Sequence, residues 1–349
     1  MKRIPTGVGL CVLGLGIAAW PVIDRLVPQA NAVGLGSAAS WAIASAVAAQ
    51  NVPARCTADI NGDGVVDGDD LGALLGAWGP CATVIAPPWA SVLEAQPNAA
   101  VVTDAATRSA ITATGWAWRV RDVATQIEMV LVPPGTYQMG CTASTQFPCS
   151  ADESPVRTVT LTNAIYVARF EVTQAQWQAR MGTNPSFFQG ATYPDAATRP
   201  VEQVSWSLVQ GFLTATGMRL LTEAEWEYAC RAGTTTAFNN GSNDGNTATN
   251  FAWFTTNAGN QTKPVGTKAG NRFGIHDMHG NVWEWVSDWY ATYPSTCQAN
   301  PTGPATGTNR VVRGGAWSAS TDFLRSSDRI FGAPASVSNA VGFRVARTP

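Results

Sequence analysis

From about residue 120 onward, short apolar runs alternate with clusters of Gly, Asn and Pro. Runs of this length, bounded by turn-forming residues, predict short strands and loops. We expect strands within residues 127–140, 157–173 and 341–347, which alternate or run apolar. Ten of the fourteen tryptophans fall between Trp116 and Trp317, so the predicted core is built from large flat side chains and not from a regular helix bundle.

Three segments carry the signals of capped helices. Each begins with a Ser or Thr, namely Thr173, Ser205 and Thr222. Gln176 and Glu225 follow the two threonines by three residues, which is the spacing of a capping box, where each side chain accepts the backbone N–H of the other residue. The expected stop signals of the second and third helices are Gly217 and Gly233.

The amino-terminal region predicts an exported protein. A basic start precedes an apolar run at residues 8–20 and a small-residue cleavage signal at residues 30–32. These features are typical of a signal peptide, which we assign to residues 1–32. We therefore expect secretion, or retention of the leader as an anchor in the cell envelope. Residues 33–55, which are rich in Ala and Ser, are assigned as a linker.

Residues 59–70, DINGDGVVDGDD, have the spacing of an EF-hand calcium loop. Gly64 at loop position six allows the sharp turn that brings the oxygen ligands together. An apolar helical face follows, so residues 56–81 resemble one half of a dockerin. Dockerins that bind cohesins carry two such repeats and this chain shows one, so a calcium-stabilised spacer is the competing interpretation. The predicted ligands are Asp59, Asn61, Asp63, the carbonyl of Val65, Asp67 and Asp70.

Composition narrows the classes of partner. The 349 residues carry a net charge of −2 and few lysines, so no basic stripe is available for phosphates and nucleic acid is not an expected partner. Six cysteines follow the leader, and an oxidising compartment allows them to pair. The sequence-local pairs are Cys56 with Cys81 and Cys141 with Cys149, which leaves Cys230 with Cys297, and the sequence leaves other pairings open.

Seven ordered segments carry a recognisable signature: MVLVPPGTYQMG, FEVTQAQW, RPVEQVSW, RLLTEAEWEYACRAG, PVGTKAGNRFGIHDMHGNVWEWVSDWY, RVVRGGAWS and GFRVAR. Together they resemble the formylglycine-generating enzyme, or sulfatase-modifying factor, family. The resemblance implies an α+β fold of the C-type-lectin-like kind, with little regular secondary structure. We assign this domain to residues 120–349, preceded by a linker at residues 82–119 and by the small EF-hand or dockerin-like module.

The resemblance also predicts what this domain lacks. Enzymes of the family oxidise a cysteine of a sulfatase to formylglycine, and they use two cysteines that hold copper after the Gly-Gly turn. In GGAWSASTDFL these positions fall on Ala319 and Leu324. Because a soft copper ion needs thiolates, we expect no copper and no catalytic residue. The structural cysteines also differ, since Cys230 is kept but Arg329 stands at its usual partner and Val345 at another cysteine position.

The residues of this sequence match the calcium ligands of the family better than they match its two thiols. Their ligands are side-chain and backbone oxygens, which suit a hard cation. In the competing interpretation, the carboxylates of the first set cap turns and pair with arginines. The first set maps to Asp277, the carbonyls of Gly280 and Val282, and Glu284. The second maps, through a shortened loop, to Asn250, the carbonyl of Phe251, Asn257 and the carbonyl of Gly259.

Three other groups of residues have a functional and a structural interpretation. His276 and His279 lie beside a carboxylate as zinc or iron ligands would, but we favour residues that flank a turn. The glutamates within residues 223–227 predict capping and solvation, and not a paired acid and base. The tryptophans within residues 283–289 predict core packing over a carbohydrate-stacking shelf.

The function that we expect is non-catalytic: a secreted, calcium-stabilised domain that binds a protein, peptide or glycan. Residues 318–341, polar and small between strand-like ends, are either the ligand surface or a plain surface loop. One alternative is an active enzyme of the family that uses other residues. Another is a cell-surface display module, attached to the envelope through the dockerin-like repeat.

Overall fold

The computed structural model describes residues 84–141 and 147–349. The predicted signal peptide, the linker at residues 33–55, the dockerin-like calcium loop and the pair Cys56–Cys81 all lie outside the described residues. Within the described part of the chain, no helix is long and apolar enough to cross a membrane.

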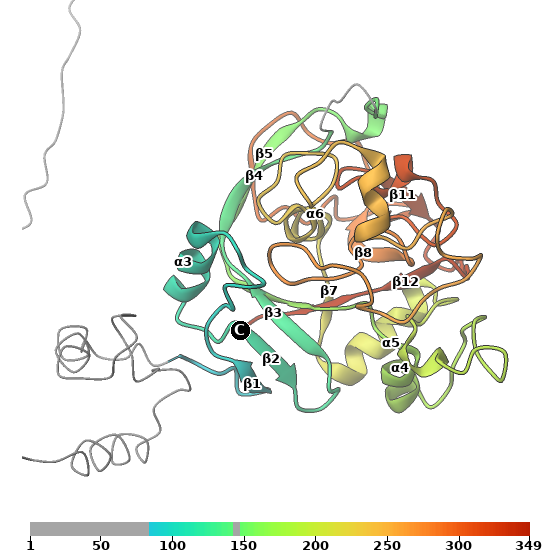
Figure 1. Cartoon of the computed structure of the whole chain (residues 1–349). Coiled ribbons are helices and arrows are strands. Elements are labelled where there is room, and N and C mark those ends of the chain that lie inside the picture. The colour runs from blue at the N-terminus through green and yellow to red at the C-terminus, as the bar shows by residue number, and fades with distance from the viewer. Residues whose placement is uncertain (1–83, 142–146) are drawn as a thin grey trace, which may run out of the picture. The chain divides into compact units, whose positions relative to one another are not determined.

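The largest sheet has six strands in the order β1-β2-β3-β6-β13-β7, and all neighbours pair antiparallel (Figure 1). Its strand β13, near the carboxyl end of the chain, lies between two earlier strands. Ala346 faces Val167 on one side and Arg219 on the other, so the sheet ties distant parts of the domain together. The strands are β1 (Ala90–Glu94), β2 (Arg119–Asp122), β3 (Glu128–Val132), β6 (Ile165–Ala168), β13 (Val345–Arg347) and β7 (Arg219–Leu220).

The remaining strands form two smaller sheets, with the strand orders β11-β10-β8-β12 and β4-β5-β9. In the first, β8 pairs antiparallel with β10 and parallel with β12. The Gly-Gly turn follows β10, so this sheet positions the region where the family chemistry is expected. The strands are β8 (Trp283–Trp289), β10 (Arg310–Arg313), β11 (Arg329–Gly332), β12 (Val341–Phe343), β4 (Gly135–Met139), β5 (Arg157–Leu161) and β9 (Gln298–Ala299). All three predicted strand regions are confirmed.

The three predicted helices are confirmed, together with their caps. Each predicted N-cap side chain accepts a backbone N–H three residues on, and both capping boxes form. The second helix ends at Gly217 in the left-handed conformation, as expected, whereas the C-cap of the third is Ala232, one residue before the predicted Gly233. The helices are α4 (Gln174–Met181), α5 (Trp206–Thr216) and α6 (Glu223–Arg231).

Residues 82–119 are not the linker that we expected. Their described part contains β1 and the helix α3 (Ala105–Ala113), which Asp104 caps by accepting the Thr107 N–H at 2.7 Å. Val102 and Ile111 are fully buried in the main core, so this segment belongs to the folded unit. Short 3₁₀ helices occupy η1 (Ala151–Glu153), η2 (Ala196–Thr198), η3 (Gly245–Asn250) and η4 (Thr321–Leu324).

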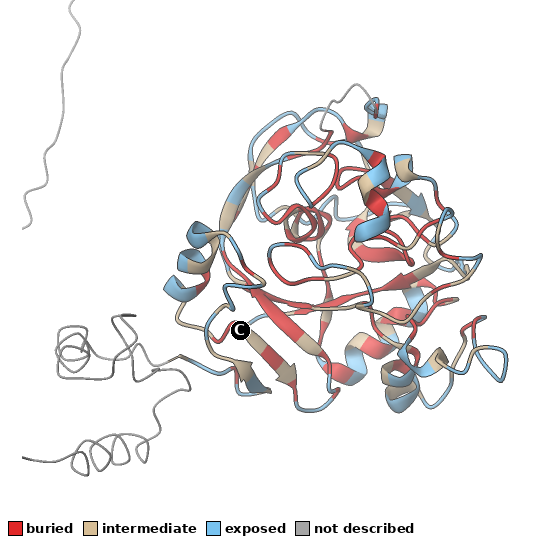
Figure 2. Cartoon of the chain, in the orientation of Figure 1, coloured by how far each residue is buried: buried red, intermediate tan, exposed pale blue. Residues whose placement is uncertain are grey.

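Buried residues gather on the strands and on the inner faces of the helices (Figure 2). Three tryptophans, Trp118, Trp177 and Trp226, are among the largest fully buried side chains, which confirms the aromatic core. The predicted disulfide Cys141–Cys149 forms. The pair Cys230–Cys297 is wrong: Cys230 is buried in α6, Cys297 is exposed, and neither forms a disulfide with any described residue.

Candidate functional site

The Gly314–Gly315 turn joins β10 to the segment that leads to η4. Both glycines have positive φ, of 102° and 80°. A Cβ on Gly315 would lie 2.4 Å from Leu324 Cδ2, and a Cβ on Gly314 would crowd the Trp226 ring at 3.1 Å. Gly280 donates its N–H to the Gly314 carbonyl at 2.8 Å. Glycine is therefore required at this turn for its backbone shape and for close packing.

Ala319 and Leu324, which we expect at the positions of the family thiols, lie in an apolar cluster. Both are buried, and no described member of the cluster offers a sulfur, nitrogen or carboxylate side chain. Aromatic rings fill the space instead, since Phe238 lies 5.4 Å from Phe147 and 5.6 Å from Phe251, between centroids. The apolar cluster comprises Phe147, Ala237, Phe238, Ala248, Phe251, Ala252, Phe254, Ala319 and Leu324.

Cys230 and His279 contact each other, and His279 also packs against Phe238 and Phe251 of this cluster. Burial raises the pKa of the Cys230 thiol to about 12 and lowers the pKa of His279 to about 4. His279 Nε2 accepts the Asn239 N–H at 3.2 Å, and Nδ1 donates to the Leu324 carbonyl. Cys230 Sγ lies 3.6 Å from Ser326 Oγ. Cys230 Sγ also lies 3.7 Å from His279 Nε2, and the two pKa shifts favour a protonated thiol beside an uncharged imidazole over a thiolate–imidazolium ion pair.

The two histidines do not share a metal site. His276 Nδ1 lies 2.8 Å from the Lys268 carbonyl and Nε2 lies 3.2 Å from the Arg169 guanidinium, so its contacts differ from those of His279. Within the described ranges, no three His, Cys, Asp or Glu side chains are grouped as a metal site would need.

Three buried carboxylates and one guanidinium form what we call the acidic cluster: Glu171, Asp277, Glu284 and Arg344. Arg344 Nη2 donates to Glu284 Oε1 at 2.6 Å. Burial first, and then the charges of Asp277 and Glu284, raise the pKa of Glu171 well above its usual range. Burial also raises the pKa of Asp277 to about 6. The described side chains of this cluster thus carry more negative than positive charge in a place that water does not reach.

The first calcium set offers side-chain and backbone oxygens, but the described residues contain no group of three or more His, Cys, Asp or Glu side chains placed to bind a metal. Asp277 Oδ2 accepts the Gly266 N–H at 2.6 Å, whereas its Oδ1 is buried without a hydrogen-bond partner among the described residues. Glu284 Oε2 accepts the Trp226 indole N–H at 2.7 Å and the Arg344 Nε–H at 2.9 Å, so this carboxylate is paired with an arginine, as the competing interpretation expects. Carboxylate and carbonyl oxygens are the ligands that calcium prefers, and its charge would offset the excess of carboxylates. Glu171 and Arg344 were missed from the sequence, where a charge inside the apolar stretches ARFEVT and GFRVAR was the available signal.

The second calcium set fits less well. Asn257 already uses its side chain within the turn, because Oδ1 accepts the Phe254 N–H and Nδ2 donates to the Ala252 carbonyl, both at 2.9 Å. Asn250 is exposed at the end of η3, and Phe251 packs in the apolar cluster. This set stays a prediction, and we derive nothing from it.

The glutamates of α6 correct the sequence interpretation. Glu225 caps the helix as predicted, by accepting the Thr222 N–H at 2.9 Å. Glu223 and Glu227, expected at the surface, are instead buried. They belong to a set of ion pairs, the α6 ion network, which comprises Glu223, Glu227, Arg231, Arg313 and Arg329. Arg329, at the family's disulfide position, therefore serves a carboxylate and not a thiol.

The comparison with known families decides the identity of the domain. Residues 118–349 match the profile described as "Sulfatase-modifying factor enzyme 1-like domain". The chain belongs to this family. It is 30% identical over 286 residues to the formylglycine-generating enzyme of Thermomonospora curvata, an alignment that covers 63% of this chain and 93% of that enzyme.

Other relatives share the domain in different contexts. The chain is 38% identical over 159 residues to serine/threonine-protein kinase pkn1 of Chlamydia caviae, which covers 44% of this chain and 25% of the kinase. The chain thus spans about a quarter of the length of the first curated relatives that it matches. Among solved structures, Treponema denticola variable protein 1 is 29% identical with a TM-score of 0.58, covering 64% of this chain and 95% of its own. PvdO from Pseudomonas aeruginosa is 27% identical with a TM-score of 0.56, covering 66% and 98%.

These similarities support the family fold, with mixed helices and sheets, for the described domain. The segment at residues 318–341 is more buried than expected, because residues 324–329 all lie inside. Its exposed apolar residues are Phe323, Phe331 and Val337, whose exposed fractions are 46%, 52% and 57%. The tryptophans of β8 pack as predicted at Trp283 and Trp285, which are buried.

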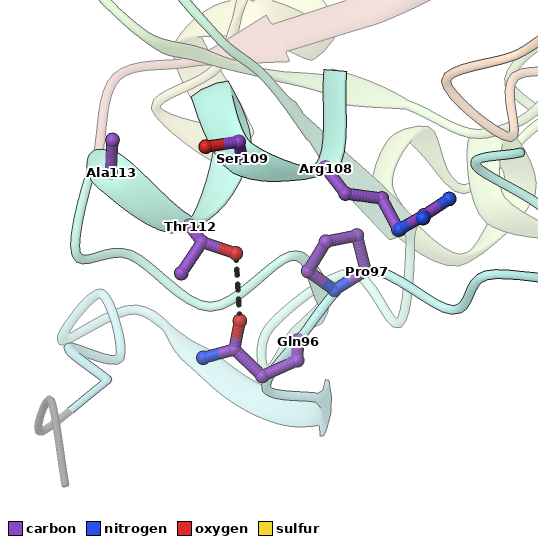
Figure 3. Close-up of a pocket in the computed structure, with 6 residues that line it drawn as sticks. All are labelled: Gln96, Pro97, Arg108, Ser109, Thr112 and Ala113. Carbon is purple, nitrogen blue, oxygen red and sulfur yellow. Dashed lines mark hydrogen bonds between the residues drawn. The ribbon is translucent and has the colours of Figure 1, made fainter. Parts of the chain in front are cut away.

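A shallow hollow of about 410 Å³ lies against α3, outside the matched family region (Figure 3). Thr112 donates its hydroxyl to Gln96 Oε1 at 2.9 Å across its floor, and Arg108 Nη1 donates to the carbonyls of Val102 and Thr103. Because these polar groups already bond within the chain, this hollow shows no built ligand site.

Proposed function

We propose that this chain is a non-catalytic member of the family, exported from the cell and stabilised by calcium, that binds a protein, peptide or glycan. One observation carries the proposal: Ala319 and Leu324 stand where the family holds its copper thiols, and both pack in the apolar cluster. An alanine and a leucine offer no lone pair to a metal and no electron to a substrate.

Copper does not fit the described residues. A soft monovalent copper ion needs thiolate ligands. Cys230 is the nearest candidate, but its thiol is buried and its pKa of about 12 keeps it protonated. A cysteine held in this state neither ligates copper readily nor acts as a nucleophile.

Calcium fits the residues of the acidic cluster. Asp277, Glu284 and the carbonyls of Gly280 and Val282 would hold it, and its contribution would be structural, since it offsets buried negative charge. The unpaired Asp277 Oδ1 supports this assignment within the described part of the chain. The N-terminal loop at residues 59–70 is proposed as an independent calcium site, with envelope attachment as its role.

Residues 318–341 are proposed as the ligand surface. Strands β10 and β12 hold the two ends of this segment, and Phe323, Phe331 and Val337 expose apolar side chains. Rigid ends with exposed apolar groups between them suit recognition of a partner. The similarity to a protein named a variable protein is consistent with a kept scaffold that carries different surfaces.

The decisive experiment uses the purified chain, loaded with copper, and a cysteine-containing sulfatase peptide. We expect no formylglycine by mass spectrometry, while the Thermomonospora curvata enzyme converts the same peptide. We also expect metal analysis to find calcium bound and copper absent. Conversion of the peptide by this chain, or stoichiometric copper bound to it, would contradict the proposal.

A further inference from the structure

A pocket of about 360 Å³ opens beside helix α5. Trp206, Gln210 and Leu213 line it, and their spacing of four and three places them on one face of the helix. Its volume lies at the small end of the range of ligand pockets, which is about 300–1,000 Å³. Strand β7, the start of α6, strand β8 and the loop before β10 supply the other walls. These residues are Arg219, Leu220, Thr222, Glu225, Ser287 and Thr302.

The indole of Trp206 is held rigidly at this pocket. Its Nε1 donates to the Val286 carbonyl at 3.0 Å. The guanidinium of Arg310 lies between two rings, 3.7 Å from the centroid of Trp206 and 3.4 Å from that of Trp289. The two rings are nearly parallel, at 26°. Arg310 covers one face of the Trp206 ring, and the part of the half-buried ring that lines the pocket is a fixed apolar surface that needs no ordering on binding.

The charges that line the pocket cancel. Arg219 Nη1 and Nη2 donate to the two oxygens of Glu225, at 2.6 and 2.8 Å. Glu225 also accepts the Thr222 N–H, so the helix cap fixes the pair in place. No other charged side chain is among the lining residues that the structure describes. The lining side chains therefore carry no net charge, and Arg310 lies behind the Trp206 ring.

A paired guanidinium and carboxylate still present a donor beside an acceptor. Two adjacent hydroxyls match this arrangement, since one accepts from the guanidinium while the other donates to the carboxylate. Gln210 and Thr302 add an amide and a hydroxyl at the rim. A flat apolar ring on one side and paired polar groups on the other are complementary to a molecule with one C–H face and neighbouring hydroxyls.

We propose that this pocket binds a neutral hexose unit of a glycan. The apolar face of the sugar would pack on Trp206, and two vicinal hydroxyls would bond to Arg219 and Glu225. A charged sugar would lack a partner for its charge. This inference goes beyond the proposed function, because it depends neither on the loss of the thiols at Ala319 and Leu324 nor on calcium.

The test uses the full chain and four uncharged disaccharides, namely cellobiose, maltose, lactose and N,N′-diacetylchitobiose, with glucuronate as the anionic comparison. We expect saturation-transfer NMR to show contact with the C–H protons of at least one disaccharide and none with glucuronate. Glu225→Gln keeps a side chain that serves in a capping box but removes the ion pair, and we expect an affinity about tenfold weaker. Trp206→Ala should abolish binding.

Ser207→Ala is the matched control, because Ser207 is exposed on the same helix and does not line the pocket. We expect it to bind as the parent chain does. Failure of all four disaccharides to bind would overturn the proposal, as would glucuronate binding as tightly as they do. Equal binding by Glu225→Gln and Ser207→Ala would also overturn it. If Trp206→Ala does not fold, the Glu225→Gln variant alone decides the test.

Discussion

The acidic cluster and the α6 ion network are both buried, but their charges balance differently. The α6 ion network sets two carboxylates against three guanidinium groups, and Glu227 bonds to Arg313 and Arg231 at 2.6 and 2.8 Å. The acidic cluster sets three carboxylates against Arg344 among its described members. The protein alone satisfies the carboxylates of the first region. In the second, the raised pKa of Glu171 shows that its proton already offsets part of the negative charge, and the proposed calcium would offset the rest.

This difference extends to the Gly314–Gly315 turn, which contacts the apolar cluster on one side and the loop of the proposed calcium set on the other. Gly315 packs against Leu324 of the apolar cluster, where the thiols of the family are absent. Gly314 accepts the N–H of Gly280, in the loop that carries the first calcium set. A soft metal has no ligands on the first side, whereas a hard cation has oxygen ligands on the second.

The largest expected effect comes from removing a cation of the α6 ion network. Arg313→Met leaves Glu227 with Arg231 alone and Glu223 with Arg329 alone, so each buried carboxylate loses one of its two guanidinium partners. Breaking a buried pair in this way typically costs about 3–5 kcal/mol in the free energy of unfolding. Urea unfolding, with and without calcium, measures the loss, which we expect to be the same in both conditions.

Arg121→Met is the control for this variant. Arg121 pairs with Glu128 at 2.8 Å, but its side chain is 40% exposed. Loss of an exposed pair should cost at most about 1 kcal/mol. If Arg313→Met were as mild as this control, the α6 ion network would not be a balanced, self-contained region.

The next effect concerns calcium at the acidic cluster. Chelation should lower the melting temperature, since a ligand at a hundred times its Kd stabilises the folded state by about 2.7 kcal/mol. Asp277→Asn should remove this response and, without calcium, should be at least as stable as the parent chain, because it removes one buried negative charge. Calorimetry with calcium and with chelator measures both states.

Two controls separate the sources of a calcium response. Asp63→Asn removes a predicted ligand of the N-terminal loop, and Asp322→Asn removes an exposed carboxylate. The first should leave the response of the acidic cluster intact, and the second should change nothing. An Asp277→Asn variant that is less stable than the parent in chelator would show that the cluster needs its negative charge and not a cation.

A smaller effect is expected from Glu202, a buried carboxyl outside both regions. Its Oε1 accepts the Phe188 N–H at 3.0 Å, its Oε2 has no partner in the described part of the chain, and burial raises its pKa to about 7. A raised pKa in the folded state stabilises the protein below the unfolded pKa, and this stability is lost as the pH rises through about 7. The free energy of unfolding should therefore fall between pH 5 and pH 8.

Glu202→Gln should reduce this fall by on the order of 1–2 kcal/mol, because the amide stays neutral throughout. Part of the pH dependence should remain, since burial raises the pKa of Asp288 and of Asp328 to about 7 as well. Urea unfolding at both pH values measures the change. An unchanged pH dependence in the variant would place the titration elsewhere.

The sequence was sufficient for features that depend on nearby residues. The helix caps at Thr173 and Thr222 follow from hydrogen bonds that span three residues, and the disulfide Cys141–Cys149 closes a short loop. The motifs of the domain also predicted its family, and Ala319 and Leu324 could be read from the residues that directly follow one of them. Each of these depends on spacing along the chain, which the sequence displays.

The tertiary structure decided which buried charges meet and which segments join the sheet. Glu284 and Arg344 are 60 residues apart, and Glu153 and Arg325 are 172 apart. Glutamates that looked solvated along α6 are buried because arginines from β10 and β11 reach them. Spacing along a helix gives the face of a side chain but not what covers that face. The packing of the whole domain decides which charged side chains are buried together. The proposed calcium site depends on the charge balance that results.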